Sequence, residues 1–149
     1  MNMEYSRRLG LFWALLLAFF MASINGCGDN LPQRVPVSGR VLLDGKPLEY
    51  GVVKFFPQNQ RMASGGIDRD GRFKLTTFSE NDGCFMGKHP VAVSSCEGIS
   101  ATKMKWYAPK KYADANTSGL EIEIPGPRSD IIIELTSEPG KKYPFVENL

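Results

Sequence analysis

The strongest constraint on this chain is a repeated alternation of apolar and polar residues in short segments. In residues 120–124, for example, Leu120, Ile122 and Ile124 alternate with glutamates. A period of two places the apolar side chains on one face of a β-strand. Turn residues separate most of these segments, and no apolar pattern with helical spacing follows the N-terminal region. The segments predicted as strands are 35–43, 50–57, 62–68, 72–76, 88–95, 120–124 and 130–135.

About seven short strands of this kind predict an all-β fold, a seven-stranded antiparallel β-sandwich of prealbumin-like or immunoglobulin-like type. Each strand offers one apolar face, which two packed sheets bury between them. We expect Glu121 and Glu123 to face solvent, because burying an unpaired carboxylate is costly. The predicted core consists of Val37, Val41, Val53, Phe55, Phe73, Leu75, Val91, Val93, Leu120, Ile122, Ile131 and Ile133. For the segment 50–57, Val52 and Phe56 offer a rival apolar face.

Two acidic-glycine segments are predicted to be turns. Asp44-Gly45 follows the first strand segment, and Asp68-Arg-Asp-Gly71 precedes another. The second segment also resembles the start of a calcium loop. Such a loop needs an oxygen ligand at its fifth position and a glutamate at its twelfth, where this chain has Arg72 and Ser79. We therefore predict a hairpin turn with Gly71 at positive φ.

The N-terminal region has the organisation of an export signal. Arg7 and Arg8 precede an uncharged apolar run from Gly10 to Ala22. This run is shorter than the about 20 residues that a membrane-spanning helix needs, and its length is typical of a signal-peptide core. We therefore expect residues 1–26 to direct export and not to belong to the folded domain.

The end of this segment, Ile24-Asn25-Gly26-Cys27, resembles the lipobox of bacterial lipoproteins. The resemblance implies cleavage before Cys27, diacylglycerol on its thiol and usually an acyl chain on the new amine. Such anchoring is stable because more than one acyl chain enters the membrane. The alternative is an ordinary secretory signal with an incidental cysteine. We expect a lipoprotein anchored to the cell envelope, in the inner or the outer membrane, with membrane lipid as its partner through Cys27.

Four parts are expected along the chain: a signal peptide at 1–26, a tether at 27–34, a β-sandwich at 35–136 and a tail at 137–149. A length of 149 residues fits one domain. The formal net charge is +2, which excludes a strongly basic nucleic-acid binder. We therefore expect no nucleic-acid partner.

Few residues are available for histidine or cysteine chemistry. A zinc site of Cys84, His89 and Cys96 is not expected, because His89 and Cys96 have opposite parity along one predicted strand. A Cys84–Cys96 disulfide would require the chain to turn back within that strand. We favour two separate thiols, with a disulfide as the alternative in an oxidising compartment. No metal and no cofactor are expected.

A hydrolase is the less favoured functional class. His89 is the only histidine, and the Gly-x-Ser-x-Gly pattern is absent from the sequence. We therefore expect no catalytic residues and a binding or structural module. Trp106, Tyr107 and Tyr112, in the long connection 97–119, offer an alternative function. They either pack over one end of the sandwich, which we favour, or contact a ligand as the stacking platform of a carbohydrate-binding module.

Several stretches occur in a particular order along the body. They are Val37-Ser-Gly-Arg-Val-Leu-Leu-Asp-Gly-Lys-Pro-Leu48, Gly51-Val-Val-Lys-Phe-Phe-Pro57, Asp68-Arg-Asp-Gly-Arg-Phe73, Gly87-Lys-His-Pro-Val-Ala-Val93, and Pro109-Lys-Lys-Tyr112 followed by Thr117-Ser-Gly-Leu120. Together they resemble the carboxypeptidase regulatory-like, or transthyretin-like, domain of small bacterial lipoproteins. The resemblance covers about residues 35–136 and implies a seven-stranded prealbumin-like sandwich.

This resemblance also implies a function class. These domains mostly lack known activity and serve as non-catalytic modules. The expected partner is an envelope protein or polysaccharide, which the sequence does not identify. The related hydroxyisourate hydrolases use several histidines and a Tyr-Arg-Gly-Ser ending. This chain has one histidine and a different C-terminal sequence, which argues against that activity.

Overall fold

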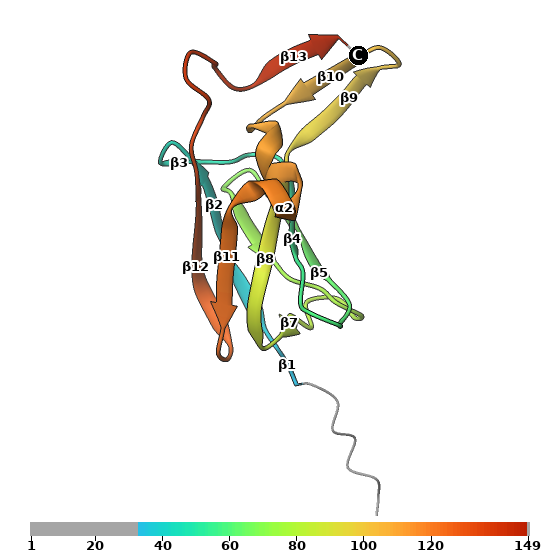
Figure 1. The fold of residues 1–149 in the computed structure, drawn as a ribbon, viewed down its shortest axis with the longest axis vertical. Helices are drawn as coiled ribbons and strands as arrows, with labels where there is room; N and C mark the ends of the chain where they lie inside the picture. The colour runs from blue at the N-terminus through green and yellow to red at the C-terminus, as the bar shows by residue number, and fades with distance from the viewer. Residues whose placement is uncertain (1–32, 149) are drawn as a thin grey trace, which may run out of the picture. The chain divides into compact units, whose positions relative to one another are not determined.

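The computed structural model describes residues 33–148, so the predicted signal segment and Cys27 lie outside the described residues. The described chain is mostly β-structure with two short helical segments, η1 (Lys110–Ala113) and α2 (Ala115–Ser118) (Figure 1). Each predicted strand segment contains an observed strand. The strands are β1 (Arg34–Val35), β2 (Val37–Leu43), β3 (Lys46–Pro47), β4 (Gly51–Phe55), β5 (Ala63–Ile67), β6 (Arg72–Lys74), β7 (Cys84–Phe85), β8 (Gly87–Ser94), β9 (Cys96–Ser100), β10 (Lys103–Trp106), β11 (Leu120–Ile124), β12 (Arg128–Leu135) and β13 (Phe145–Asn148).

One sheet has the strand order β11-β8-β4-β5, and all its pairings are antiparallel. Val53 of β4 lies opposite Val93 of β8. Both side chains are buried, whereas Val52 on the other face of β4 is exposed. The register therefore turns the predicted face of β4 toward the core, because a slip by one residue would expose that whole face.

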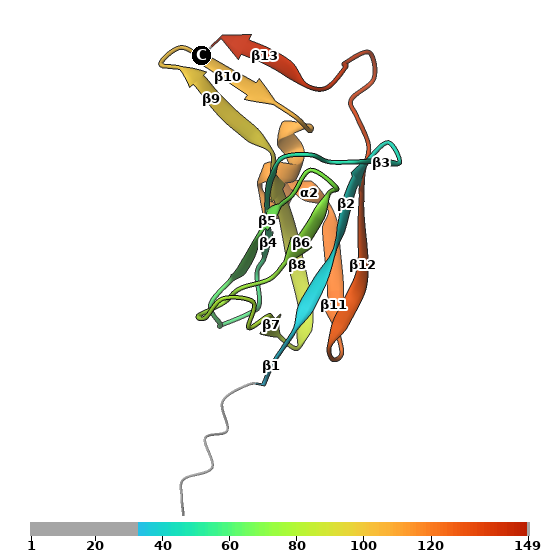
Figure 2. The same cartoon turned by 180° about the vertical axis from the view of Figure 1, so that it is seen from behind.

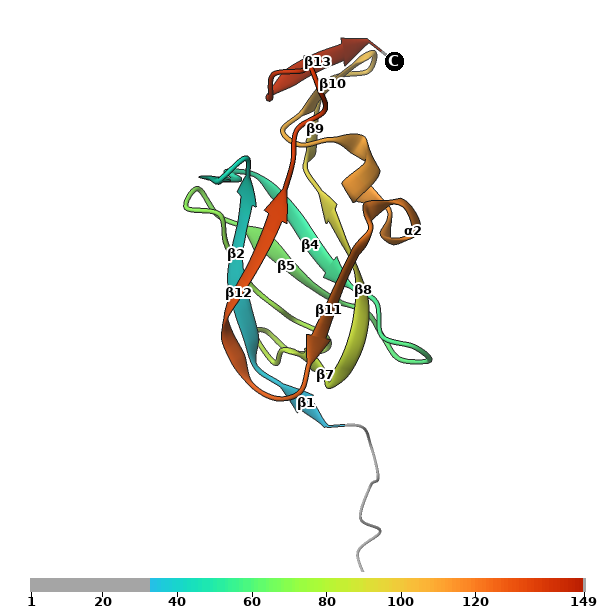
Figure 3. The same cartoon turned by 60° about the vertical axis from the view of Figure 1, so that its left-hand side comes forward.

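The second sheet has the order β12-β2-β3, with β6 also paired to β2. Figure 3 shows β2 and β12 across the core from β8 and β11. β12 pairs with β2 in parallel, and Ile133 lies opposite Val41. The expectation of antiparallel pairing throughout is therefore wrong for this pair. Alternation assigns the faces of a strand, but it carries no information on the direction of the neighbouring strand.

The turn after β5 joins the two sheets at one corner (Figure 2). The N–H of Gly71 donates to the carbonyl oxygen of Asp68 at 2.9 Å, and the Asp68 carboxylate accepts the N–H groups of Asp70 and Arg72. Gly71 has φ +76°, which confirms the predicted turn. Asp44 and Gly45 also have positive φ between β2 and β3, as the primed turns of hairpins require.

Most of the predicted core is confirmed. Leu120 and Ile122 are the exceptions, because they are only partly buried and pack against the edge of the core. β11 is the outer strand of its sheet, so one side of it has no neighbouring strand. Glu121 and Glu123 are exposed, as predicted. Buried apolar residues outside the prediction include Val35, Leu48, Ala63, Ile67, Cys84, Phe85, Ala92, Ala108, Tyr112, Ile124 and Leu135.

A third sheet, β13-β10-β9, extends beyond one end of this body (Figure 1). We call it the projecting sheet. We call the two packed sheets, together with η1 and α2, the body. The connection 97–119 was expected to be a loop, but it contains β9, β10 and both short helices. The segment expected to be a tail contains β13, which pairs with β10. The described strands therefore exceed the predicted seven.

The opposite end of the body carries β1 paired with β7 (Figures 1 and 3). In this strand pair, Arg34 lies opposite Phe85 and Val35 lies opposite Cys84. The described chain thus starts at the end of the body that lies farthest from the projecting sheet. Within residues 33–148, every helix is too short or too polar to cross a membrane.

Candidate functional site

His89 is a buried structural residue on β8. Its side chain is fully buried and its Nε2 lies 2.8 Å from the carbonyl oxygen of Phe85. The ring also lies beside Phe55, with centroids 5.9 Å apart. Burial lowers the pKa of His89, because the charged imidazolium loses its hydration. A neutral imidazole enclosed in this way has no access to a substrate.

The two described cysteines are separate free thiols, as predicted. Cys84 is buried in the core, and burial raises the pKa of its thiol to about 11. Cys96 lies at the start of β9 and is partly buried. Within residues 33–148, no group of three or more His, Cys, Asp and Glu side chains is arranged to hold a metal ion.

The three aromatic residues considered as a stacking platform lie in different environments. Tyr112 is buried in the core, and its hydroxyl accepts the N–H of Thr136 at 3.0 Å. The Tyr107 ring packs against the ring of Tyr50, with centroids 5.0 Å apart, and Lys105 Nζ lies 4.7 Å from the Tyr107 centroid. Tyr107 is therefore engaged by two neighbours, and Tyr112 offers no face to solvent.

Trp106 belongs to the projecting sheet. It lies opposite Phe145 of β13 and opposite Cys96 of β9, and Lys110 Nζ lies 5.1 Å from its ring centroid. The side chain is partly buried by these neighbours. The structure thus does not bring Trp106, Tyr107 and Tyr112 together as one flat surface.

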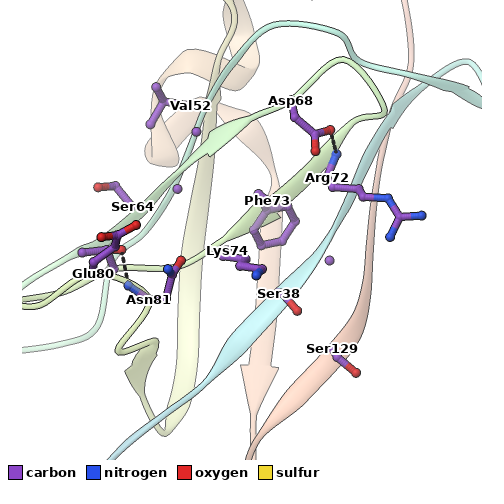
Figure 4. Close-up of a pocket in the computed structure, with 14 residues that line it drawn as sticks. Ser38, Val52, Ser64, Asp68, Arg72, Phe73, Lys74, Glu80, Asn81 and Ser129 are labelled. Atoms are coloured by element: carbon purple, nitrogen blue, oxygen red, sulfur yellow. Dashed lines mark hydrogen bonds between the residues drawn. The ribbon is translucent and has the colours of Figure 1, made fainter.

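One surface hollow, of about 650 Å³, lies where β5 and β6 approach each other (Figure 4). Its charged side chains balance, since Asp68 and Glu80 oppose Arg72 and Lys74. A Cβ on Gly65 would lie 2.3 Å from the backbone oxygen of Lys74. Gly65 therefore allows the two strands to approach closely, because it has no side chain. This close approach accounts for the hollow without a ligand.

A second hollow, of about 720 Å³, lies between the body and the projecting sheet. We call it the joint groove. It is lined by the β2–β3 hairpin region 43–49, by Lys105 and Tyr107, and by residues of the segment 137–144 that leads to β13. Three separate parts of the chain thus meet around one concave surface.

The joint groove has an excess of positive charge. Its cations are Lys46, Lys105, Lys141 and Lys142, and its acids are Asp44 and Glu49. Among the described residues, Lys141 forms an ion pair with Glu138, whereas Lys46, Lys105 and Lys142 form none. Ammonium groups placed in this way attract phosphate and carboxylate groups.

Asp44 holds the two sides of the groove together. Its carboxylate accepts the N–H of Ser137 at 3.0 Å, and its own N–H donates to the carbonyl oxygen of Leu135 at 2.9 Å. The hydrogen bond from Ser137 lowers the pKa of the Asp44 carboxyl. This acid therefore has a structural partner already, and it offsets the lysines only in part.

Sequence reasoning did not find the groove lysines. Lys46 follows a predicted turn, Lys105 lies in the supposed loop, and Lys142 lies in the supposed tail. No spacing in the sequence indicates that these three meet, because their proximity depends on how β13 returns to β10. Comparison with family models, with curated proteins and with solved structures gave no match for this chain.

Proposed function

We propose that this chain is a membrane-anchored, non-catalytic lipoprotein of the cell envelope, and that its β-domain is a binding module. Support for the anchor comes from the sequence, where a lipobox-like Cys27 follows a short apolar run. Support for a binding role comes from the joint groove. His89, the only imidazole, is enclosed in the core, which argues against acid–base catalysis by that residue.

The observation that carries the binding proposal is the excess of lysines over acidic residues around the joint groove. The ligand class that fits them is an acidic envelope polysaccharide, whose carboxylate or phosphate groups pair with ammonium groups. Neutral sugars bind mainly by stacking on aromatic faces. Tyr107 already packs against Tyr50 and Lys105, and Tyr112 is buried, which argues against that mode.

We also propose that β2, β4, β5, β6, β8, β11 and β12 form a prealbumin-like sandwich, to which the projecting sheet is an addition. The ordered stretches in residues 37–120 that resemble transthyretin-like domains support this proposal. A sandwich of this kind predicts a circular dichroism spectrum dominated by β-structure for residues 28–149.

Intact-mass measurement of the protein extracted from membranes tests the anchor. The expected mass is that of residues 27–149 plus acyl groups on Cys27. A mature chain without acyl groups, or one that retains residues 1–26, contradicts the proposal. A Cys27→Ser variant should remain unprocessed and unacylated.

Binding of residues 28–149 to an acidic and to a neutral polysaccharide tests the ligand class. We expect binding to the acidic polymer that weakens with salt. The double variant Lys105→Gln, Lys142→Gln should weaken it by about tenfold or more, because two charge-assisted contacts are lost. The matched control Arg72→Gln, Lys74→Gln removes the same charge from the other hollow and should bind like the parent. Equal loss in both variants contradicts a specific groove.

A further inference from the structure

The end of the body where the described chain begins has an unusual surface. Phe78 is 56% exposed, Met86 is 44% exposed and Met62 is 43% exposed. A contiguous patch of exposed apolar side chains marks an interaction surface. Arg61, which precedes Met62 in the chain, and Phe85, which precedes Met86, both contact the Phe78 ring. We call Phe78, Met62, Met86 and the two arginines beside them, Arg34 and Arg61, the basal patch.

Contacts at the Phe78 ring connect it to Arg34, Arg61 and Phe85. The guanidinium carbon of Arg34 lies 4.7 Å from the Phe78 ring centroid, and that of Arg61 lies 5.1 Å from it. The Phe85 ring meets Phe78 edge-on at 6.4 Å. Met86 follows Phe85 directly, and its N–H donates to the Gln33 carbonyl oxygen at 3.4 Å. An exposed ring with two guanidinium groups close to it is thus held beside the start of β1.

The loop that carries Phe78 is fixed by Asp82. This carboxylate accepts the N–H groups of Thr77, Phe78 and Ser79, and it forms an ion pair with Arg34 at 3.3 Å. Backbone N–H groups bonded to one carboxylate fix the loop conformation. The exposure of Phe78 is therefore imposed by the fold and is not the result of a loose loop.

We propose that the basal patch docks on the lipid surface that holds the acylated Cys27. The proposal rests on the proposed function, because Cys27 is the anchor. Residues 28–33 separate Cys27 from Arg34, and a fully extended chain between these two residues reaches only about 25 Å. This end of the body therefore lies next to the bilayer, whatever path the segment takes.

The chemistry of the patch fits the interface of an anionic bilayer. Aromatic rings and methionine side chains enter the region between headgroups and acyl chains. Arg34 is paired with Asp82, whereas Arg61 forms no ion pair among the described residues and is placed to pair with a lipid phosphate. The projecting sheet and the joint groove lie toward the opposite end of the body (Figure 1). Docking through the basal patch therefore presents the joint groove to the envelope space.

Fluorescence quenching in vesicles tests this orientation without depending on natural acylation. The Cys27 thiol of residues 27–149 is coupled to a maleimide lipid in a Cys96→Ser background. Cys84 does not compete, because it is buried and has a raised pKa. The vesicles contain phosphatidylglycerol and phosphatidylethanolamine with brominated acyl chains, which quench only tryptophans close to the bilayer.

Trp106 is the only tryptophan of residues 27–149 and serves as an internal control on the projecting sheet. We expect brominated lipid to leave the Trp106 emission unchanged. In a Phe78→Trp variant, the added emission should be quenched and shifted to the blue. Absence of quenching at position 78, or equal quenching at both positions, overturns the proposal.

Flotation of uncoupled residues 28–149 with the same lipids gives a second measurement. Replacing Phe78 by serine should weaken vesicle binding by about tenfold, because the apolar surface of one aromatic ring no longer enters the lipid. Ile99→Ser, an exposed apolar residue of the projecting sheet, is the matched control and should bind like the parent. Equal binding of the parent and Phe78→Ser contradicts docking. Failure of the proposed anchor at Cys27 is a separate result, because it would be seen only in the intact mass.

Discussion

The body and the projecting sheet are both built of β-strands, but different interactions hold them. In the body, Val53, Phe55 and Val91 have no exposed surface, because they lie between two sheets. In the projecting sheet, Ile99 and Val146 are more than half exposed, and no second sheet among the described residues covers them. Apolar burial therefore stabilises the body, whereas backbone pairing and edge contacts hold the projecting sheet. Regions with less burial open more readily.

The two regions meet through a small number of contacts. The N–H of Tyr107 donates to the Ser95 carbonyl oxygen at 2.8 Å, and the Tyr107 ring lies against Tyr50. On the other side, Asp44 accepts the N–H of Ser137. We therefore expect the projecting sheet to open locally while the body stays folded.

The largest effect is expected from Phe73→Ala in the body. Phe73 is buried, and its ring packs against Phe55 with centroids 6.3 Å apart. The free energy of unfolding should fall by about 3–5 kcal/mol, through lost transfer free energy and a cavity. Denaturant melts of residues 28–149 measure it, with Val146→Ala as the control that should change stability by under about 0.5 kcal/mol. A loss below about 1 kcal/mol for Phe73→Ala contradicts a shared core.

The next largest loss of stability is expected from alanine substitutions at two glycines that have the same φ angle. Gly71 in the body and Gly140 before β13 both have φ +76°. A Cβ on Gly71 would lie 2.6 Å from the Val41 oxygen, whereas a Cβ on Gly140 meets nothing within 4 Å. Gly140→Ala should cost about 1 kcal/mol from the backbone angle alone, and Gly71→Ala should cost about 2–4 kcal/mol because the clash adds to it.

Thermal and denaturant unfolding of the two alanine variants, measured side by side, gives the comparison. Equal losses of unfolding free energy in the two variants would show that the backbone around Gly71 accommodates a Cβ as easily as the segment before β13. That result would weaken the distinction between a tightly packed body and a loosely attached sheet.

Acid should destabilise the body through His89 before it affects any carboxylate. The folded pKa of His89 is lowered by burial, so at mildly acidic pH the unfolded chain binds more protons than the folded one. Stability is then complete above the unfolded pKa of about 6.5 and falls as the pH decreases toward the folded pKa, by at most about 1.4 kcal/mol per pH unit.

Denaturant melts between neutral pH and pH about 5 measure this slope, above the range where Asp and Glu titrate. A His89→Gln variant should lose the slope, whatever its stability at neutral pH. An unchanged slope in that variant would assign the acid sensitivity to other groups.

The smallest effect is expected from Lys110→Gln, which removes the ion pair with Glu147 between η1 and β13. The attraction of Lys110 lowers the pKa of Glu147, but exposed pairs contribute little to stability. Hydrogen exchange should speed up modestly at the amides of β10 and β13, while the body amides and the unfolding midpoint stay unchanged. Faster exchange in the body would contradict local opening.

The sequence by itself determined the strands of the body and their inner faces. Phe73 and Leu75 are buried and Lys74 is exposed, as alternation predicts, because the period of two is a local property of an extended chain. For β4, the structure decided between the face of Val53 and Phe55 and the rival face of Val52. The positive φ of Gly71 was predictable for a similar reason, since the turn chemistry is contained within a few residues. The export signal and Cys27 stay sequence predictions, because they lie outside the described residues.

Only the tertiary structure decided the direction of β12 beside β2, the placement of Tyr112 in the core and the return of β13 to β10. These features depend on contacts between residues far apart in the chain, and local patterns carry no information about them. The joint groove and the basal patch arise in the same way. Lys46, Lys105 and Lys142 become neighbours of one groove, and Arg34 meets Phe78, only because packing of the core fixes where the loops and strand ends lie.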